Sequence, residues 1–255
     1  MPTREKLLGA QRTMGPGAKQ LEYPIWSALT TRHARFAFGN DLARRYPPAI
    51  SPMAAVRDVS DSCLRALSEL LTSDDVIGLF SAEPVSGGKY LEVVALKVVD
   101  QMVYEREEAP SGSREFINLT PADVPEMLSL VELTKPGPFA PETIALGSYI
   151  GIRSQGELIA MAGERMKFDG FTEISAVCSH PNHRGRGHST SLVRTLMHSI
   201  RNCGELPFLH VYSDNTTAAA LYTKLGFTHL RSFTVTVLRR SRTEVCLSWP
   251  TSNGY

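Results

Sequence analysis

Two glycines and two arginines lie together in one short loop, directly before a segment with helical periodicity. The loop and its flanks read Ser179-His180-Pro181-Asn182-His183-Arg184-Gly185-Arg186-Gly187-His188-Ser189. Glycine lets the backbone approach a ligand closely, and a helix start offers unpaired N–H groups and partial positive charge. The loop therefore predicts a site for a phosphate or pyrophosphate group. A plain strand-to-helix turn with solvated arginines is the alternative interpretation.

Two well-known phosphate loops do not fit this segment. A P-loop needs a Lys-Ser or Lys-Thr pair after its glycines, and none follows Gly187. A dinucleotide-binding loop needs a third glycine, which is also missing here. The loop alone therefore predicts an anion site without naming the ligand.

Alternating and helical patterns around the loop predict the elements that position it. A strand is expected over residues 171–179, a helix over 188–201, a strand over 208–212, a helix over 216–225 and a strand over 233–238. Upstream, Thr120-Pro121-Ala122-Asp123 is typical of a helix start with a capping box. Strands are expected over 149–153 and 158–166. This order predicts an α/β (α+β) sheet domain.

The N-terminal part of the chain contains no catalytic motif. A helix is expected over residues 58–71 and strands over 76–80 and 91–104. A charged stretch followed by small residues, with both Pro and Gly, marks residues 106–116 as an exposed linker. We therefore expect a support lobe over residues 1–105 and a second domain over 117–255.

Composition limits the classes of partner. The chain has 255 residues with 27 Lys plus Arg and 26 Asp plus Glu, and its near-neutral net charge of +1 argues against nucleic acid. The four cysteines, Cys63, Cys178, Cys203 and Cys246, have no CxxC spacing, so free buried thiols are expected. No signal peptide and no membrane-spanning apolar run is expected. The protein is expected to be cytoplasmic and not to bind a membrane.

Two segments together resemble the GNAT superfamily of N-acetyltransferases. Residues 171–189 resemble the family's acyl-CoA motif, a strand followed by Pro and Arg-x-x-Gly-x-Gly/Ala before a helix. Residues 209–227, with Asn215 and Leu221-Tyr222-Thr223-Lys224-Leu225-Gly226-Phe227, resemble its second motif. The resemblance covers about residues 118–233 and implies a mixed central sheet flanked by helices. The N-terminal half resembles, more loosely, the degenerate half of two-lobed members.

The resemblance implies acetyl-CoA as the cosubstrate. The strand end would pair with the pantetheine arm, the loop would hold the pyrophosphate, and Asn215 would contact the cofactor or cap its own helix. Ser189 departs from the usual Gly or Ala, but serine is small and can cap a helix. The cofactor residues implied are Val177, Cys178, Ser179, Arg184, Gly185, Arg186, Gly187, His188, Ser189, Asn215 and Tyr222.

Two residues match positions of catalytic groups in the family. Tyr222 matches a tyrosine that protonates the departing CoA thiolate, which a phenol can do when held close. Glu173 matches a general base of some members, because the attacking amine must first lose a proton. Packing of an aromatic side chain and a solvent-facing strand carboxylate are the respective alternatives. The histidines His180, His183, His188 and His210 are further candidates for proton transfer.

The resemblance implies direct transfer of acetyl to a primary amine in a ternary complex. The acceptor would be a small molecule, a peptide N-terminus or a lysine. A non-catalytic acyl-CoA sensor is the alternative, and an anion- or nucleic-acid-binding module is disfavoured by charge. The Pro-rich loop at 135–141 borders the acceptor groove in the family, and Phe139 is a candidate for its lining. No metal is expected, and a homo-oligomer is compatible with the sequence.

Overall fold

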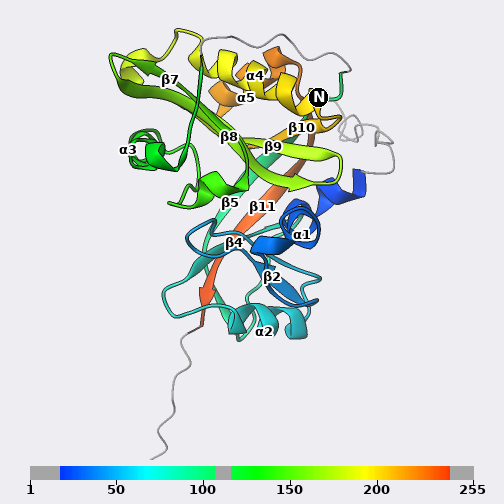
Figure 1. Cartoon of the computed structure of the whole chain (residues 1–255). Helices are drawn as coiled ribbons and strands as arrows, with labels where there is room; N and C mark the ends of the chain where they lie inside the picture. Colours follow the sequence, from blue (N-terminus) through cyan, green and yellow to red (C-terminus); the bar gives the residue numbers. More distant parts are fainter. Residues whose placement is uncertain (1–17, 107–115, 242–255) are drawn as a thin grey trace, which may run out of the picture.

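The computed structural model describes residues 18–106 and 116–241 (Figure 1). Its helices are α1 (Pro24–Thr30), α2 (Asp61–Glu69), α3 (Val124–Thr134), α4 (His188–Asn202) and α5 (Thr216–Leu225). Its strands are β1 (Phe38–Gly39), β2 (Ala43–Arg45), β3 (Ala54–Val56), β4 (Val76–Ser81), β5 (Leu91–Val103), β6 (Ile117–Asn118), β7 (Tyr149–Ser154), β8 (Glu157–Phe168), β9 (Phe171–Ser179), β10 (Leu206–Tyr212) and β11 (Thr228–Arg240). Cys246 and most of the expected linker lie outside the described residues.

One mixed sheet of eight strands runs through the molecule in the order β4-β11-β5-β10-β9-β8-β7-β6. The pair β9–β10 is parallel, and the other neighbouring strands are antiparallel. Helices cover both faces of this sheet (Figure 1). The expected α/β class with a mixed central sheet is confirmed.

The expected boundary at residues 106–116 does not coincide with a break in this sheet. β5 precedes the boundary in sequence, yet it lies between β10 and β11 and pairs with both. β4 likewise pairs with β11. Backbone pairing of this kind joins the two parts of the chain into one layer. The assignment of residues 1–105 to a separate support lobe stays a prediction.

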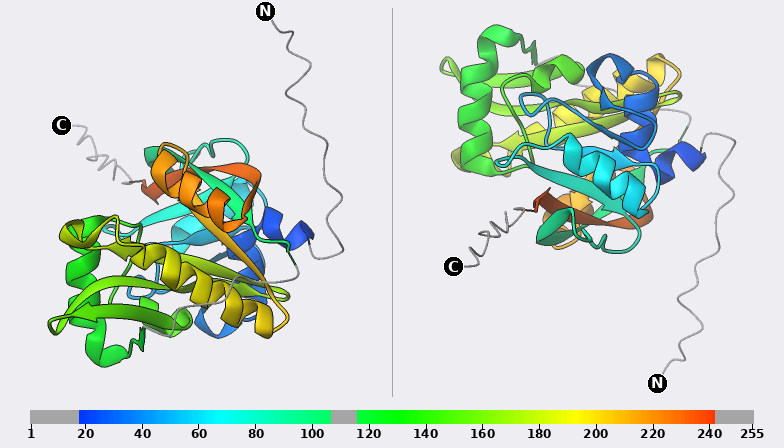
Figure 2. Two further views of the ribbon diagram at one scale, coloured as in Figure 1. Left: turned by 90° about the horizontal axis from the view of Figure 1, so that it is seen from above. Right: turned by 90° about the horizontal axis from the view of Figure 1, so that it is seen from below.

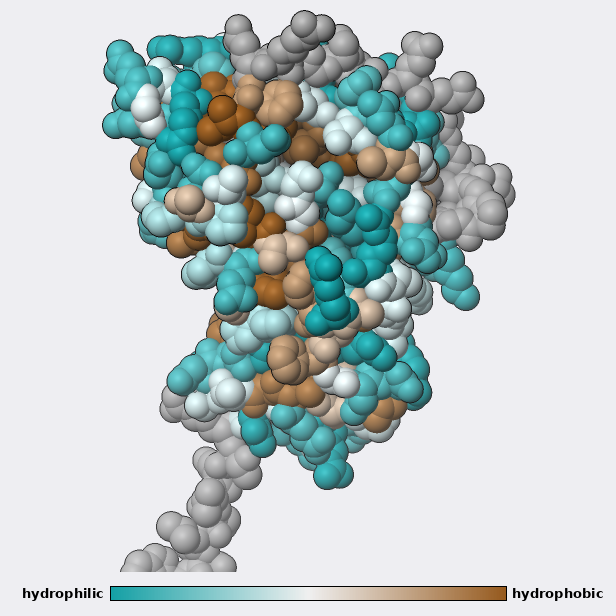
Figure 3. Space-filling view, viewed as in Figure 1, coloured by the Kyte–Doolittle hydropathy of each residue, from teal (hydrophilic) through white to brown (hydrophobic). Residues whose placement is uncertain are grey.

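A smaller body surrounds the far ends of β4, β5 and β11. It holds the three-stranded sheet β1-β2-β3, which touches the main sheet through a bridge between Met53 and Gly78. α2 packs here, with Leu64 and Leu67 buried against Ile77 and Leu238. Figure 3 shows that the molecule narrows between this body and the larger one.

The two faces of the main sheet carry different helices. α4 lies across β8 and β9 (Figure 2) and buries Leu192, Val193, Leu196 and Ile200, the stripe expected from the sequence. On β8, Ala160 and Ala162 pack in the α4 cluster, whereas Met161 packs with α3. Because neighbouring residues of a strand point to opposite faces, α4 and α3 cover opposite faces. α1 packs beside Phe171 and Phe208 on the α3 side.

Local capping signals of the sequence are present. Thr120 and Asp123 form the expected capping box ahead of α3. Asn215 caps α5, its side-chain oxygen accepting from the N–H of Ala218 at 3.1 Å. Of the cysteines, Cys63 and Cys178 are buried free thiols as expected, but Cys203 is exposed because it follows the last turn of α4. No helix in the described ranges is long and apolar enough to cross a membrane.

Candidate active site

The parallel strands β9 and β10 stay paired for only a few residues and then separate. Their ladder runs from Phe171↔Leu206 to Glu173↔Phe208 and ends there. A cavity of about 970 Å³ occupies the space beyond, lined on its two sides by residues 174–179 of β9 and 210–212 of β10. The backbone groups of β9 on this side therefore have no partner strand in β10.

A β-bulge shapes the β9 wall of the cavity. The register with β8 shifts between Met161↔Cys178 and Gly163↔Ser175, which leaves one extra residue in β9. Ala176 lies in this bulge with φ 53°, a conformation that is uncommon for a residue with a side chain. Bulges redirect a strand and leave backbone groups unpaired, so this one opens hydrogen-bonding positions toward the cavity.

The glycine-rich loop closes one end of the same cavity. Gly185 and Gly187 have φ of 75° and 82°, which glycine adopts without steric cost, and Gly187 is the N-cap of α4. The Ser179 and Ser189 hydroxyls are 3.0 Å apart, so the end of β9 is tied to the first turn of α4. The unpaired N–H groups of this turn lie at the cavity wall and suit an anion.

The structure brings nearly all of the expected cofactor residues into one wall. Arg186 is the exception, because its side chain is exposed and does not line the cavity. The expected residues that line the cavity are Val177, Cys178, Ser179, Arg184, Gly185, Gly187, His188, Ser189, Asn215 and Tyr222. They come from β9, from the loop, and from α4 and α5, which the sequence separates by up to 45 positions.

Tyr222 reaches the cavity from α5. Its ring packs edge-on against Phe227, with the ring centroids 6.0 Å apart. Burial, together with the neighbouring Cys178, raises the pKa of Tyr222 to about 12. Its hydroxyl has no hydrogen-bond partner among the described residues. The phenol is therefore protonated at neutral pH and free to donate toward the cavity.

Cys178 is a buried thiol at the same wall. Burial raises the pKa of the Cys178 thiol to about 11. A thiol with this pKa is protonated near pH 7 and is a poor nucleophile, because the thiolate is the reactive form. The geometry therefore fits a structural thiol beside the cavity.

Glu173 sits at the point where β9 and β10 separate, but it does not line the cavity. Its carboxylate is fully buried, and both oxygens accept hydrogen bonds. Oε2 accepts from Arg165 Nε at 2.8 Å and from the Met166 N–H, while Oε1 accepts from Arg165 Nη2 at 2.5 Å and from His210 Nδ1 at 2.8 Å. Although burial alone would raise it, Arg165 and His210 hold the pKa of Glu173 low, at about 2.

His210 connects this buried carboxylate to the cavity, which it lines. Because a carboxylate can only accept, Nδ1 carries the hydrogen and Nε2 is left as the site for proton uptake. The side-chain amide of Gln101 lies 3.2 Å from Nε2, and its own Oε1 is buried without a partner. Burial lowers the pKa of His210, partly offset by Glu173, so the imidazole is neutral near pH 7.

His210 is one of four histidines that the sequence offers as candidates for proton transfer, and no sequence pattern links it to Glu173. Their contact joins residues 37 positions apart. No sequence pattern singles out Arg165, although Asp169-Gly170 is typical of a tight hairpin turn. A hairpin closing there brings residues near 165 opposite residue 173.

The cavity passes through the gap between β9 and β10, so its walls include side chains from opposite faces of the sheet. Val177, Tyr222 and the α4 start lie on the α4–α5 side, with Val211. His210 points the other way, with its ring 5.0 Å from Phe80 and 5.7 Å from Phe208. Alternation along the strands explains this division.

The Pro-rich loop after α3 also reaches the cavity. Residues 135–138 line it, whereas Phe139 packs edge-on against Tyr149 at 5.6 Å and is not part of the wall. The candidate role of Phe139 in the groove lining is therefore not supported by its position.

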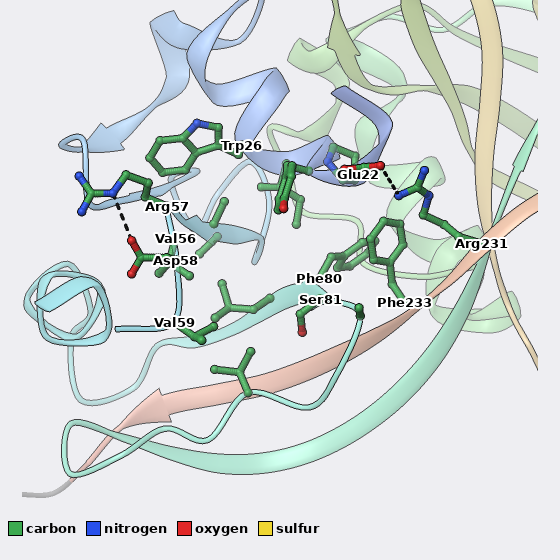
Figure 4. A pocket seen from close by; sticks show the side chains of 18 of the residues that line it. Glu22, Trp26, Val56, Arg57, Asp58, Val59, Phe80, Ser81, Arg231 and Phe233 are labelled. Carbon is green, nitrogen blue, oxygen red and sulfur yellow. Dashed lines mark hydrogen bonds and ion pairs between the residues drawn. The ribbon is translucent and has the colours of Figure 1, made fainter. Parts of the chain in front are cut away.

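A second cavity of about 380 Å³ lies between α1, β3, β4 and β11 (Figure 4). Phe80 contributes to the walls of both cavities. Charged side chains at the smaller cavity are already paired, Arg231 with Glu22 and Arg57 with Asp58. None of the expected site residues lines it. In residues 18–106 and 116–241 no group of three or more His, Cys, Asp or Glu side chains is arranged to hold a metal ion.

Comparisons with known proteins connect this site to a family. The profile of the FR47-like protein family matches residues 149–236, which include β9, the loop and α5. The sequence is 35% identical over 72 residues to an uncharacterized N-acetyltransferase, YobR, of Bacillus subtilis, covering 28% of this chain. It is 34% identical over 84 residues to the N-alpha-acetyltransferase RimI of Mycobacterium tuberculosis, covering 31% of this chain. These matches span 29% and 51% of the two curated relatives.

A solved structure extends the similarity to nearly the whole described chain. The crystal structure of a GNAT-family protein from Novosphingobium aromaticivorans is 36% identical to this chain, with a TM-score of 0.81. The match covers 87% of this chain and 99% of that one, so it includes the N-terminal strands as well as the cavity. This chain therefore belongs to the GNAT family.

Proposed function

We propose that this protein is an N-acetyltransferase that moves the acetyl group of acetyl-CoA directly to a primary amine. Family membership supports acetyl transfer. The cavity between β9 and β10 supports a ternary complex because side chains from both faces of the sheet line it. The observation that carries the proposal is the convergence of ten expected cofactor residues on that one cavity. They come from four separate elements.

The cosubstrate binds from the α4–α5 side. The N–H groups at the α4 start and the Arg184 side chain suit its pyrophosphate. The bulged segment of β9 offers unpaired backbone groups to the amides of the pantetheine arm. This placement directs the thioester into the gap between the two strands.

The acceptor amine attacks from the opposite side, where His210 lines the cavity. An amine is protonated near pH 7 and must lose a proton to attack. The Gln101 amide, which lies 3.2 Å from His210 Nε2, first moves aside so that Nε2 takes the proton from the amine. The amide then turns so that its unpartnered Oε1 accepts from the new N–H. Glu173 stabilises the resulting imidazolium through Nδ1. The general-base role expected for Glu173 thereby becomes a positioning role exerted through His210.

Tyr222 completes the reaction from the side of the leaving group. Its protonated hydroxyl donates to the CoA thiolate as the thioester bond breaks. Cys178 takes no part as a nucleophile, because its thiol is buried and protonated. The acetyl group therefore passes to the amine without an acyl-enzyme.

A thiol-release assay tests the proposal. The full chain is incubated with acetyl-CoA and a panel of amino acids, polyamines, aminoglycosides and short peptides, and free CoA is measured. We expect amine-dependent release for at least one class. Saturable acetyl-CoA binding without release for any amine would support the alternative, a non-catalytic acyl-CoA sensor. Absence of acetyl-CoA binding would contradict both.

A further inference from the structure

The half of the cavity that faces away from α4 has an apolar floor. β4, β11 and β5 run side by side there, and direct cross-strand partners place Phe80 beside Val235 and Val235 beside Lys97. Val99 and Val237 lie two residues along β5 and β11 from Lys97 and Val235, on the same face, and also line the cavity. We call this surface of Phe80, Lys97, Val99, Val235 and Val237 the acceptor floor. It suits an acceptor with an apolar group.

The charges at this cavity are of one sign. No aspartate or glutamate is among its lining residues in the ranges that the structure describes. Its charged lining residues are Lys97, Lys135, Arg165 and Arg184. A polyamine or aminoglycoside carries several positive charges, and each would be repelled without a carboxylate to pair with. The wall therefore selects against an acceptor with a second positive charge.

Two of these cations are available to a ligand on the side of His210. Arg165 is nine-tenths buried, and Glu173 occupies its Nε and Nη2, while Nη1 has no hydrogen-bond partner among the described residues. Because Arg165 lines the cavity, its Nη1 is left to donate to an oxygen of a bound ligand. Lys97 Nζ lies over the ring of Tyr212, 5.3 Å from its centroid, and has no ion-pair partner within residues 18–106 and 116–241.

We propose that the acceptor is a small amine with an apolar group and a carboxylate, the chemistry of a free apolar α-amino acid. The apolar group lies on the acceptor floor, and Lys97, whose Nζ lies over the Tyr212 ring, faces the carboxylate. In this orientation the amine faces His210 and the gap between β9 and β10. This inference rests on the proposed acetyltransferase function and narrows its acceptor.

The proposal also gives the N-terminal half a role. Met53, Val76 and Phe80 precede residue 106 and line the same cavity as His210. Without them the floor would lack its β4 edge. The N-terminal half thus contributes substrate specificity in addition to support.

Matched acceptor pairs test the inference in the full chain with saturating acetyl-CoA. The pairs are leucine with leucinamide and phenylalanine with phenylalaninamide, with putrescine as a dication, and the readout is kcat/KM for CoA release. We expect at least one of the free amino acids to exceed its amide by about tenfold or more, and putrescine to be the poorest. Equal rates within both pairs, or preference for putrescine, would overturn the inference while the acetyltransferase function stands. No release with any amine in the panel would overturn both.

A charge reversal separates recognition from general effects. Lys97→Glu should lower kcat/KM for the preferred amino acid by about tenfold and change that of its amide much less. Lys89→Glu is the control, because Lys89 stacks on Tyr90 at 5.2 Å in the same way but does not line the cavity. Equal effects of the two substitutions would contradict a carboxylate at Lys97. Unchanged thermal unfolding of both variants shows that the fold is retained.

Discussion

Glu173 Oε1 and His210 Nδ1 are 2.8 Å apart, at the last residue pair before β9 and β10 separate. One residue is fully buried, and the other reaches the cavity. The contact therefore couples a buried charged carboxylate to a neutral imidazole at the cavity wall.

Replacing His210 should remove the proton acceptor and leave the cosubstrate site intact. His210→Gln keeps a donor toward Glu173 but cannot take up a proton. We expect kcat to fall by about 10²–10⁴-fold, with little change in acetyl-CoA affinity. In the wild type, kcat should fall on the acid side below pH 6.5, because the pKa of His210 is lowered. A variant with the wild-type rate and pH profile would contradict this role.

Glu173→Gln should act through both stability and the pH profile. The buried Arg165 would lose its counter-charge, which typically costs about 3–5 kcal/mol of unfolding free energy. Glu173 raises the pKa of His210, so its loss should move the acid limb of kcat to lower pH. Glu126→Gln is the control, because Glu126 pairs with Arg153 at the surface and its loss should cost about 1 kcal/mol or less. An unshifted acid limb would make Glu173 purely structural.

Tyr222→Phe should lower turnover and spare cosubstrate affinity. The hydroxyl makes no hydrogen bond within the described residues, so its removal leaves no buried partner unsatisfied. We expect kcat to drop by about 10²-fold or more, as measured by CoA release at saturating acetyl-CoA. Tyr149→Phe is the control, since Tyr149 is equally buried and its unpartnered hydroxyl lies away from the cavity. Equal kcat values for the two variants would exclude Tyr222 as the acid.

Acid should destabilise the fold in two successive, slightly overlapping pH ranges. Burial lowers the pKa of His33 from 6.5 to about 4, so its unfolded form binds a proton that the folded form excludes. At 1.36 kcal/mol per pKa unit, this pKa difference corresponds to about 3 kcal/mol of unfolding free energy. The stabilisation is present above pH 6.5 and is lost as the pH falls toward 4. The Glu173 contribution is present above pH 4.5 and lost toward pH 2.

Chemical denaturation across this range checks the His33 contribution. His33→Gln does not titrate and keeps an acceptor for the Tyr46 hydroxyl, which lies 2.9 Å from His33 Nδ1. The wild type should lose more stability than the variant between pH 6.5 and 4.5. Parallel curves over that interval would contradict the contribution of His33.

Local patterns predicted the elements that line the α4–α5 side of the cavity. Gly185, Gly187 and Asn215 act through backbone conformation and capping, which depend on neighbours in sequence. α4 and α5 were expected within a residue of their observed ends for the same reason. These elements carry most of the cavity wall at which we propose that the cosubstrate binds.

The acceptor side could not be predicted in this way, because it depends on pairing between distant strands. Lys97 lines the cavity only because β5 lies between β10 and β11. The sequence predicts either a solvent-facing or a catalytic carboxylate at Glu173. In the structure this carboxylate is buried and paired with Arg165 and His210. β11 also extends beyond the expected 233–238, since its first residues pair with β5 despite their polar character.

Acetyl-CoA titration of the wild type and the Ser189→Asp variant tests the central claim most directly. An aspartate in the first turn of α4 favours the helix but repels a pyrophosphate bound there. We predict saturable micromolar binding to the wild type, about tenfold or greater weakening in the variant, and no loss of thermal stability without ligand. Equal acetyl-CoA affinities in the two proteins, or no binding to the wild type, would contradict the placement of acetyl-CoA between β9, α4 and α5.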